Sequence, residues 1–281
     1  MCRQCGTQFV RRYRSGKWQR SLFEEYVFGK QTLKQLADKH GRTTKTIQKY
    51  LDRYQRTAPG NLTAQTIVMG IDCSFFGRGY GIIVARCPGL RQNLYWKEIT
   101  TENKAVYEEA RRYLEETGLN IRAVVIDAKH GIKEVFPGLV IQICQYHQKQ
   151  IVQRYLTASP KTQAGQELKL IANSLTEDTE QAFAQALEEW HAKWRGVLTE
   201  RTYSPDGRHW WYTHKRLRAA YRSLHTNLPY LFSYQKYPEL KIPNTNNSLE
   251  GYFSKLKQLL NNHHGLKRWR RYRLIEAVLN N

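Results

Sequence analysis

Hydrophobic positions repeat with different periods along the chain, and the changes in period predict where its structural parts begin and end. Apolar residues recur at helical spacing in three short segments near the N-terminus, which predicts helices at 22–28, 32–40 and 43–54. Short apolar runs bounded by glycine and proline follow, and they predict strands at 66–72, 79–87, 93–100, 121–127 and 139–144. A helix is expected at 104–117, so the middle part mixes strands and helices.

This order of elements predicts an α/β fold with a mixed sheet and helices on its faces. From residue 148 to about 237 helical spacing returns and strand patterns are absent, as in the series Phe183, Leu187, Trp190 and Trp194. A further helix is expected from about 247 to 260, followed by a basic tail. A long helical segment therefore interrupts the mixed part of the chain.

The pattern divides the chain into five parts, with a linker at 57–65. They are a partial zinc-ribbon-like segment (1–20), a helix-turn-helix module (21–60), the first part of an α/β core (66–147), an all-helical insertion (148–240), and the second part of the core with a basic C-terminal tail (241–281).

The chain carries a strong positive charge, with 45 Lys and Arg against 24 Asp and Glu and a net charge of +21. The basic residues are spread from end to end, which excludes a neutral domain with one basic tail. Solvated basic faces are one explanation, but a polyanion partner accounts better for so large a charge. The 281 residues, 41% of them hydrophobic, suffice for one large core and a small module.

Cysteine usage and hydropathy predict the compartment. Only Cys2 and Cys5 of the five cysteines are close together, so no disulfide framework is visible and a reducing environment is expected. No apolar run approaches the roughly 20 residues that cross a bilayer, and the N-terminus lacks the apolar segment of a signal peptide. We therefore expect a cytoplasmic protein that has no membrane partner and that associates with the nucleoid if its partner is DNA.

The segment Cys2-x-x-Cys5-Gly-x-x-Phe9 is typical of one knuckle of a zinc ribbon. A closed structural zinc site needs four ligands, and the next cysteine, Cys73, falls inside a predicted strand. Three explanations stay open: the sequence begins inside a longer ribbon, the knuckle is vestigial, or a partner completes it. Zn²⁺ is expected here only if two further ligands are supplied.

The helices at 32–40 and 43–54, joined at Gly41 and opened by Thr43, are typical of a helix-turn-helix. An ordinary three-helix packing unit would show the same pattern. The charge favours DNA binding, because residues 1–60 hold 14 Lys and Arg against 4 Asp and Glu. The polar residues of the last helix that suit phosphates and base edges are Arg42, Lys45, Gln48, Lys49 and Arg53.

Three acidic residues, Asp72, Asp127 and Glu250, stand where an acid is hard to explain by structure alone. Each aspartate closes an apolar run, and Glu250 starts a Lys-rich amphipathic stretch. Each acid also has a structural alternative: a turn or bulge for Asp72, a helix cap for Asp127, and a capping box with Asn247 for Glu250.

Together the three acids suggest a metal centre. Adjacent strand ends at one edge of an α/β sheet are where ligands usually bind, and carboxylate oxygens are hard ligands that suit Mg²⁺ or Mn²⁺. Two such ions about 4 Å apart can clamp the attacking and leaving oxygens of a phosphoryl displacement. In so basic a chain, this centre points to phosphodiester chemistry on nucleic acid.

Further polar residues near these acids have two explanations each. Cys144 ends the strand predicted at 139–144, and His147 follows it. They are either a buried thiol and a hydrogen-bonded imidazole, or a pair that supports the metal centre. Residues 251–281 hold 7 Lys and Arg against 1 acid, which favours contacts with DNA phosphates over a solvated face. The DNA-contacting residues expected there are Lys255, Lys257, His263, His264, Lys267, Arg268, Arg270 and Arg271.

The helical insertion also contains a basic and aromatic cluster. Trp210, Trp211 and Tyr212 precede several basic residues, which are Lys215, Arg216, Arg218 and Arg222. A tryptophan here can stack on a flipped base, but packing in the core is the expected role for most of these rings.

A family resemblance rests on four motifs taken in order. They are Gly70-Ile71-Asp72, Val125-Ile126-Asp127, Cys144-x-x-His147 and Asn246-Asn247-x-x-Glu250. Their order and spacing resemble the Mutator-like (MULE-type) DDE transposases of bacterial insertion sequences, over most of the chain. The resemblance implies an RNase H-like, retroviral-integrase-like fold, in which Asp72 lies on the first strand, Asp127 at the end of the fourth and Glu250 on a late helix.

The resemblance further implies that Asp72, Asp127 and Glu250 hold two Mg²⁺ or Mn²⁺ ions, with Cys144 and His147 in a supporting role. The expected enzyme binds transposon terminal inverted repeats, hydrolyses a strand to leave a 3′-hydroxyl, and joins it to target DNA by transesterification. Cutting two ends implies at least a homodimer on DNA. Two alternatives stay open: a non-catalytic helix-turn-helix regulator (a domesticated transposase), and an RNase H-like nuclease that never joins strands.

Overall fold

The computed structural model describes residues 15–54, 66–263 and 265–280, and the chain divides into two compact units. We call Leu62–Gly251 the sheet unit, and Met1–Asn61 together with Tyr252–Asn281 the terminal unit. Helix α10 (Asn247–Asn262) starts in the sheet unit and ends in the terminal unit. Cys2, Cys5, His264 and the predicted linker lie outside the described residues.

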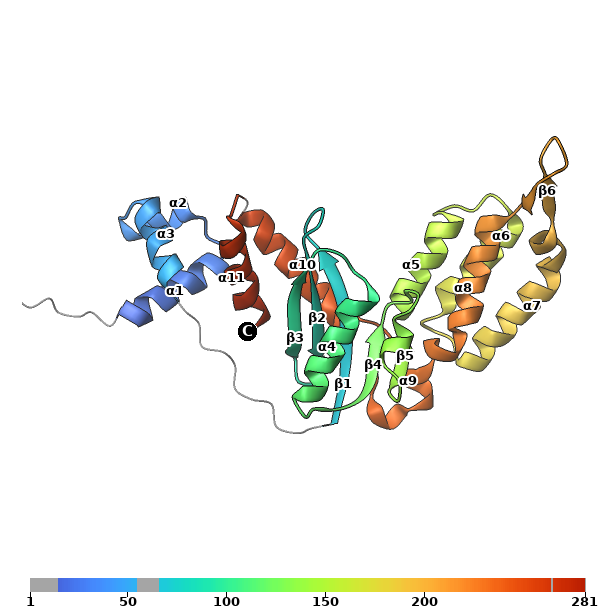
Figure 1. Cartoon of the computed structure of the whole chain (residues 1–281), viewed down its shortest axis with the longest axis horizontal. Helices are drawn as coiled ribbons and strands as arrows, with labels where there is room; N and C mark the ends of the chain where they lie inside the picture. The colour runs from blue at the N-terminus through green and yellow to red at the C-terminus, as the bar shows by residue number, and fades with distance from the viewer. Residues whose placement is uncertain (1–14, 55–65, 264, 281) are drawn as a thin grey trace, which may run out of the picture. The chain divides into compact units, whose positions relative to one another are not determined.

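The sheet unit is built on a five-stranded mixed sheet with the strand order β3-β2-β1-β4-β5 (Figure 1). Strands β1, β2 and β3 pair antiparallel, whereas β1, β4 and β5 pair parallel. The elements are β1 (Thr66–Phe75), β2 (Gly81–Cys87), β3 (Gln92–Ile99), α4 (Lys104–Glu116), β4 (Asn120–Ile126), the 3-10 turn η1 (Lys133–Val135) and β5 (Val140–Ile143). The mixed α/β sheet expected from the sequence is confirmed.

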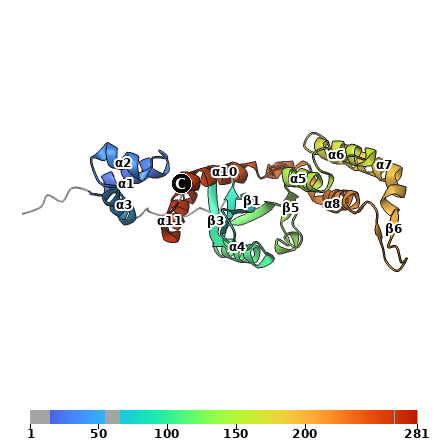
Figure 2. The same cartoon turned by 90° about the horizontal axis from the view of Figure 1, so that it is seen from above.

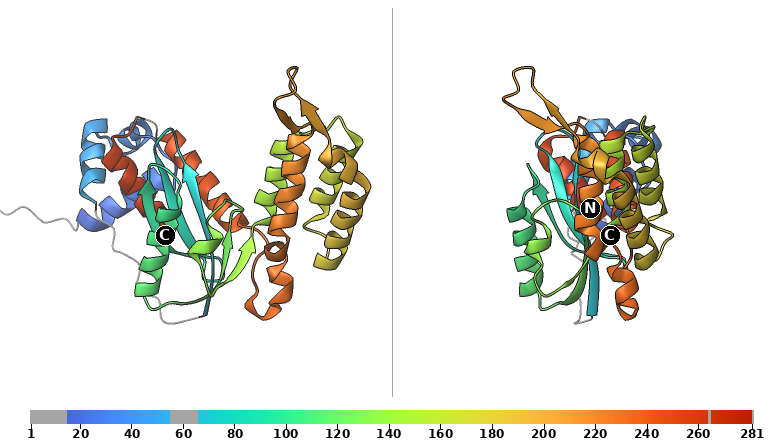
Figure 3. Two further views of the ribbon diagram at one scale, coloured as in Figure 1. Left: turned by 45° about the vertical axis from the view of Figure 1, so that its right-hand side comes forward. Right: turned by 90° about the vertical axis from the view of Figure 1, so that its right-hand side faces the viewer.

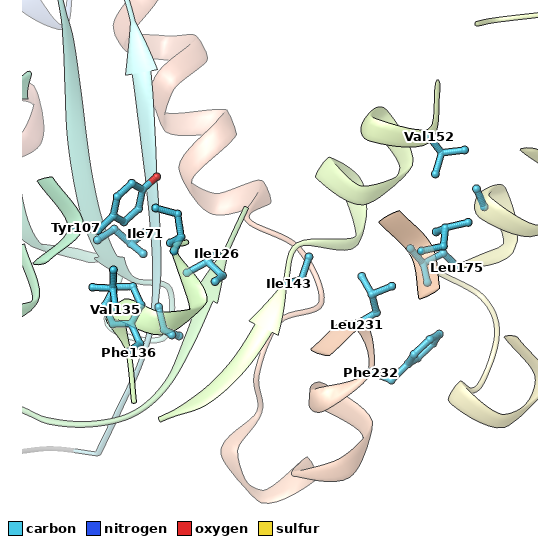
Figure 4. Close-up of a cluster of buried hydrophobic side chains, with 14 of the residues drawn as sticks. Ile71, Tyr107, Ile126, Val135, Phe136, Ile143, Val152, Leu175, Leu231 and Phe232 are labelled. Atoms are coloured by element: carbon cyan, nitrogen blue, oxygen red, sulfur yellow. The ribbon is translucent and has the colours of Figure 1, made fainter. Parts of the chain in front are cut away.

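One face of the sheet carries the large hydrophobic core. Successive side chains of a strand point to opposite faces, and Ile71 on β1 and Ile126 on β4 both belong to this core. Tyr107 from α4 is buried in the same cluster (Figure 4). Asp72 and Asp127 are each one residue further along the chain, so the period of two assigns them to the opposite face.

Residues 145–240 are mainly helical, and the long helices pack in neighbouring pairs, α5 with α8 and α6 with α7 (Figure 2). The elements are α5 (Gln145–Leu156), α6 (Gln163–Ser174), α7 (Glu180–Thr199), α8 (Lys215–Leu231), α9 (Ser233–Lys236) and the 3-10 turn η2 (Pro238–Leu240). The first of these helices begins at Gln145, three residues before the expected start of the helical insertion at 148.

The helical block also contains a β-hairpin, which corrects the expectation that strands are absent there. Strands β6 (Arg201–Tyr203) and β7 (Trp210–Tyr212) pair antiparallel and project from one end of the block (Figure 3). Aromatic residues favour strands, and the turn contains Gly207 at a φ of 69°. The strands are too short to show an alternating pattern, so the Asp-Gly turn was the available signal.

The tryptophans of this hairpin are exposed, which corrects their expected role in the core. Trp210 and Trp211 are 46% and 38% exposed. The Arg201 guanidinium lies 4.0 Å from the centre of the Trp210 ring, and the Lys215 ammonium lies 5.5 Å from the Trp211 ring. Cation–π contacts with these basic residues therefore replace core packing for both rings.

Buried amides join the helical block to the sheet. Gln142, Gln145 and Gln148 are fully buried. The side-chain NH₂ groups of Gln142 and Gln145 donate to Leu231 O at 2.9 and 3.0 Å, and Asn227 donates to Gln148 Oε1 at 2.8 Å. An unpaired buried amide would cost about 1–3 kcal/mol, so these partners fix α8 against β5 and α5. Glutamine at every third position across the β5–α5 junction is a signal that the sequence interpretation missed.

Over its described residues, the terminal unit contains three N-terminal helices, most of α10, and a C-terminal helix. Its elements besides α10 are α1 (Ser15–Val27), α2 (Leu33–His40), α3 (Thr44–Arg53) and α11 (Arg268–Leu279). Thr32 and Thr43 cap α2 and α3 through their side chains, and Gly41 ends α2 at a φ of 59°. None of the described helices is both long and apolar enough to span a bilayer.

Helix α11 replaces the basic tail expected from the sequence. Its second half buries Leu274, Ile275 and Val278, while Arg268 is exposed at its start. The basic residues of the first half hide this apolar face in the sequence. Residues from Tyr252 onward group with the N-terminal helices, although the sequence placed them with the second part of the core.

Two residues expected to contact DNA instead hold the terminal unit together. His263 is buried, and its Nε2 lies 3.0 Å from Tyr26 O, so its place on the surface is corrected. Arg270 donates from Nε and Nη2 to the Asp52 carboxylate at 3.0 and 2.8 Å. A two-pronged Arg–carboxylate pair of this kind joins α11 to α3.

Replacing Asp52 by alanine is expected to lower the free energy of unfolding of the terminal unit by about 1–3 kcal/mol, because a half-buried guanidinium loses its charged partner. Thermal and urea unfolding followed by circular dichroism measure the loss. Asp38→Ala, on the surface of α2, is the control and should change stability by less than about 0.5 kcal/mol. Equal midpoints for the two variants would contradict the role given to the pair.

Candidate metal centre

Asp72 and Asp127 are brought together by the parallel pairing of β1 and β4. Gly70 on β1 pairs with Val125 on β4, and each aspartate comes two residues later on the same face. Neighbouring strands are about 4.8 Å apart, so the two carboxyl groups leave adjacent strands side by side. Asp72 does not end its strand, however, because β1 continues to Phe75 in its antiparallel pairing with β2. The expected pair of strand ends is corrected to one strand interior and one strand end.

Asn246 places the third acid over these strands. Its side-chain NH₂ donates long hydrogen bonds to Ile71 O at 3.5 Å and to Val125 O at 3.4 Å, one from each of the two strands. Its backbone carbonyl accepts from the N–H groups of Leu249 and Glu250, which are in the first turn of α10. The residue that opens the helix is therefore clamped between β1 and β4.

Gly70 makes room for this clamp. A Cβ atom at position 70 would lie 2.4 Å from Asn246 Oδ1 and 3.3 Å from Leu249 Cδ1. Real side chains do not approach so closely, so only glycine lets Asn246 reach both strands. The glycine of the Gly70-Ile71-Asp72 motif thus has a packing role. Asn246 itself is a site residue whose role the sequence interpretation missed, since nothing local marks a buried asparagine.

Glu250 faces His147 on α5 and not its own helix end. Helix α10 already includes Asn247, so the expected capping position falls inside the helix. Glu250 Oε1 is buried, lies 3.1 Å from His147 Nε2, and has no aligned hydrogen-bond partner among the described residues. An acid placed in this way is available to a cation.

His147 lies between two of the acids. Its Nε2 faces Glu250, and its Nδ1 is 4.0 Å from Asp127 Oδ1. Burial lowers the pKa of His147, but the neighbouring Cys144 side chain and the negative charges of Asp127 and Asp72 outweigh it and raise the pKa to about 9. The imidazole is therefore protonated at neutral pH and supplies positive charge at the centre of the acids.

Asp72 is the most deeply buried of the three acids, at 9% exposure. Burial raises the pKa of its carboxyl to about 7, while the charge of His147 and the N–H of Cys73 act to lower it and the charge of Asp127 adds to the rise. The raised pKa shows that the positive charge around Asp72 does not offset the burial of its carboxyl. A divalent cation beside Asp72 would supply that charge.

The donor chemistry of Asp72, Asp127 and Glu250 fits a hard divalent cation such as Mg²⁺ or Mn²⁺, because all three offer carboxylate oxygens. Their oxygens do not form one tight group in the described part of the chain, because the His147 ring stands between Asp127 and Glu250. The protonated ring occupies the position where cationic charge is needed.

Replacing Asp72 by asparagine is expected to raise the melting temperature of the metal-free protein by a few degrees at about pH 8. The folded-state pKa of about 7 exceeds the ordinary 3.8, so the native state binds more protons between these values and stability falls as pH rises through them. Asparagine carries no charge and removes this cost. Thermal scans should show that the rise in melting temperature shrinks toward about pH 4. A wild-type protein that is more stable than Asp72→Asn at pH 8 would contradict the raised pKa of Asp72.

The expected DNA-contacting residues all belong to the terminal unit, and most of those described are exposed. The exposed ones are Arg42, Lys45, Lys49, Arg53, Lys255, Lys257, Lys267 and Arg268. Gln48 is half-buried and donates to Asp52 Oδ1 at 3.0 Å, and Arg271 is half-buried. A positive surface therefore covers α3, α10 and the start of α11.

Two strand transfer complexes are among the solved structures to which this chain is similar. The solved structure of the Drosophila P element transposase strand transfer complex aligns with 99% of this chain and 94% of that chain, at a TM-score of 0.46 and 9% identity. The Mos1 strand transfer complex aligns with 84% of this chain and 79% of that chain, at 0.19 and 12%. A scan against protein-family models and a search of curated proteins find no match. At such values, the function of this chain has to be argued from its own residues.

Proposed function

We propose that the chain is a DDE transposase of the Mutator-like class, which cuts and joins DNA with divalent ions held by Asp72, Asp127 and Glu250. The observation that supports the proposal is that Asp72 and Asp127 lie on adjacent strands while His147 contacts both Asp127 and Glu250. Asp72 and Asp127 come from adjacent strands, and Asn246 fixes the start of the Glu250 helix to the same two strands.

In this proposal the sheet unit is an RNase H-like catalytic core, and the terminal unit binds DNA. Helices α2 and α3, with Gly41 between them, act as a helix-turn-helix that contacts transposon ends through Arg42, Lys45 and Lys49. The chain works as a dimer on DNA, since two ends are cut. The zinc-ribbon-like segment at 1–20 extends the DNA contacts if further ligands complete it.

The three acids would share the metal-binding role in the proposed reaction. Asp72 and Asp127 would hold a divalent cation, and Glu250 would add a carboxylate ligand from α10. Mg²⁺ or Mn²⁺ at these residues would supply the positive charge that activates an attacking oxygen and offsets the charge developing on the phosphorus oxygens. His147 orients Glu250 and lowers the pKa of Asp72 by its charge, and Cys144 lies beside His147 in a supporting role.

The direct test is incubation of the wild-type chain with duplex DNA that contains the ends of its own element, in Mg²⁺, Mn²⁺ or EDTA. Nicking at the ends in either metal but not in EDTA is the expected result. Pre-cut ends should then be joined to a target plasmid. Specific binding without nicking would favour the regulator, and nicking without joining would favour the nuclease.

A further inference from the structure

Three side chains beside the proposed catalytic acids form a donor group of a different chemical kind. Cys144 Sγ, a ring nitrogen of His147 and a carboxylate oxygen of Glu250 all lie within 4.8 Å of one another. Cys144 is fully buried, and the other two are half-buried, so a cation can enter from their side. Neither Asp72 nor Asp127 belongs to this group.

We propose that Cys144, His147 and Glu250 form a second metal site, which takes a thiophilic divalent cation of the Zn²⁺ class and withdraws Glu250 from the magnesium set. Binding at this site follows from the donor geometry alone. The effect of the bound cation on DNA cleavage rests on the proposed transposase function.

The backbone around the site is held in place before any cation binds. The Cys144 N–H donates to Ile126 O at 2.8 Å, next to Asp127, and the Gln145 N–H donates to Asn244 O at 2.9 Å. The Asn246 N–H donates to Cys144 Sγ at 3.3 Å. A backbone N–H directed at sulfur stabilises a thiolate and fixes its orientation, as partners of metal ligands commonly do.

The donors match an open zinc site. Three protein ligands drawn from thiolate, imidazole and carboxylate, with water as the fourth, are typical of Zn²⁺. Zinc–ligand bonds of about 2.0–2.3 Å place tetrahedral donors roughly 3.3–3.8 Å apart, so the side chains must close by about 1 Å. On binding, the thiol proton and the proton of the coordinating imidazole nitrogen pass to solvent, and no oxidant or reductant is needed.

The two metal sites differ in the softness of their donors. The thiolate of Cys144 selects Zn²⁺ or Cd²⁺, whereas the carboxylates of Asp72 and Asp127 select Mg²⁺ or Mn²⁺. Glu250 is common to both sets and cannot serve them fully at once. A thiophilic cation at Cys144 and His147 is therefore an inhibitor of the proposed reaction, and the Cys144-x-x-His147 motif controls which metals the centre tolerates.

A cadmium titration tests the site without DNA. Cd²⁺–thiolate bonds absorb in the ultraviolet, so Cd²⁺ is added to the full-length chain carrying Cys2→Ser and Cys5→Ser, which removes the N-terminal thiols. We expect a band that saturates at one equivalent. Cys144→Ser should abolish it, and His147→Gln or Glu250→Gln should raise the half-saturating Cd²⁺ concentration at least about tenfold.

Two control variants give the test its specificity. Cys73→Ser removes a different thiol of the same unit, and Asp72→Asn removes a proposed magnesium ligand. Both should leave the cadmium band unchanged. A band that persists in Cys144→Ser, or that disappears in Asp72→Asn as fully as in Cys144→Ser, would overturn the proposed site. Circular dichroism checks that each variant is folded, and His147→Gln provides the test if Cys144→Ser does not fold.

The inhibitory effect is measured separately, in the magnesium-dependent cleavage assay. Micromolar Zn²⁺ should reduce the rate of the wild-type chain, and the reduction in Cys144→Ser, relative to that variant's own zinc-free rate, should be at least about tenfold smaller. Equal inhibition of the wild-type chain and of Cys144→Ser would contradict the proposal that both metal sites use Glu250. A chain that binds Cd²⁺ at Cys144 but never cleaves DNA would keep the metal site and refute the transposase.

Discussion

Replacing Glu250 by glutamine should reduce magnesium-dependent cleavage of transposon-end DNA by more than about a hundred-fold, while DNA binding changes less than about twofold. Losing even a residue that only supports a metal ligand costs about 10–100-fold, and Glu250 is a proposed ligand itself. Glutamine keeps the size of the side chain and removes its charge. Asp127→Asn should behave in the same way, because Asp127 lies on the other side of His147.

Glu239→Gln is the matched control for this loss, because Glu239 is an exposed acid in η2 of the same unit. Single-turnover cleavage and a gel-shift assay on the same DNA separate catalysis from binding. The control should cleave at the wild-type rate. Cleavage by Asp127→Asn or Glu250→Gln at more than about a tenth of that rate would remove the residue from the mechanism.

Replacing Asn246 by alanine should lower the free energy of unfolding of the sheet unit by about 2–3 kcal/mol and reduce cleavage as strongly as Glu250→Gln. The side-chain amide is buried and donates to both Ile71 O and Val125 O, so its removal takes away both hydrogen bonds and frees the start of α10. Urea unfolding and the cleavage assay measure the two effects.

Asn247→Ala provides a control one residue away. Asn247 is exposed and lies within the helix, so its loss should change stability by less than about 0.5 kcal/mol. Gly70→Ala disturbs the same contact from the β1 side, because the added Cβ would overlap Asn246 Oδ1. It should destabilise the sheet unit by about 1–3 kcal/mol. An Asn246→Ala protein as stable and active as Asn247→Ala would show that the clamp does not position Glu250.

The sequence predicts the elements of this chain well where periodicity and caps agree. Gly41 ends α2 and Thr43 opens α3 as expected, and Thr32, predicted as the first residue of its helix, caps α2. Alternating and continuous apolar runs predict β1 to β5 because their residues are buried on a sheet. The side-by-side placement of Asp72 and Asp127 follows from the same pattern.

What the sequence does not predict depends on contacts between distant segments. The burial of His263 is set by Tyr26, and the pairing of Arg270 by Asp52, both more than two hundred residues away. The local sequence shows Asn246 only as one polar residue in a polar loop, although its side chain joins two strands to a helix. Local patterns give period and charge, but they do not show which polar residue will be enclosed by the rest of the chain.

The most direct test of the metal centre is a crystal structure of the full chain with end DNA and Mn²⁺, from which anomalous density locates each manganese atom. We predict manganese between Asp72 and Asp127, at about 2.0–2.2 Å from carboxylate oxygens, with a second ion that also contacts Glu250. Saturating Mn²⁺ that leaves no density beside Asp72 and Asp127, or that binds only elsewhere on the chain, would contradict the proposed catalytic centre.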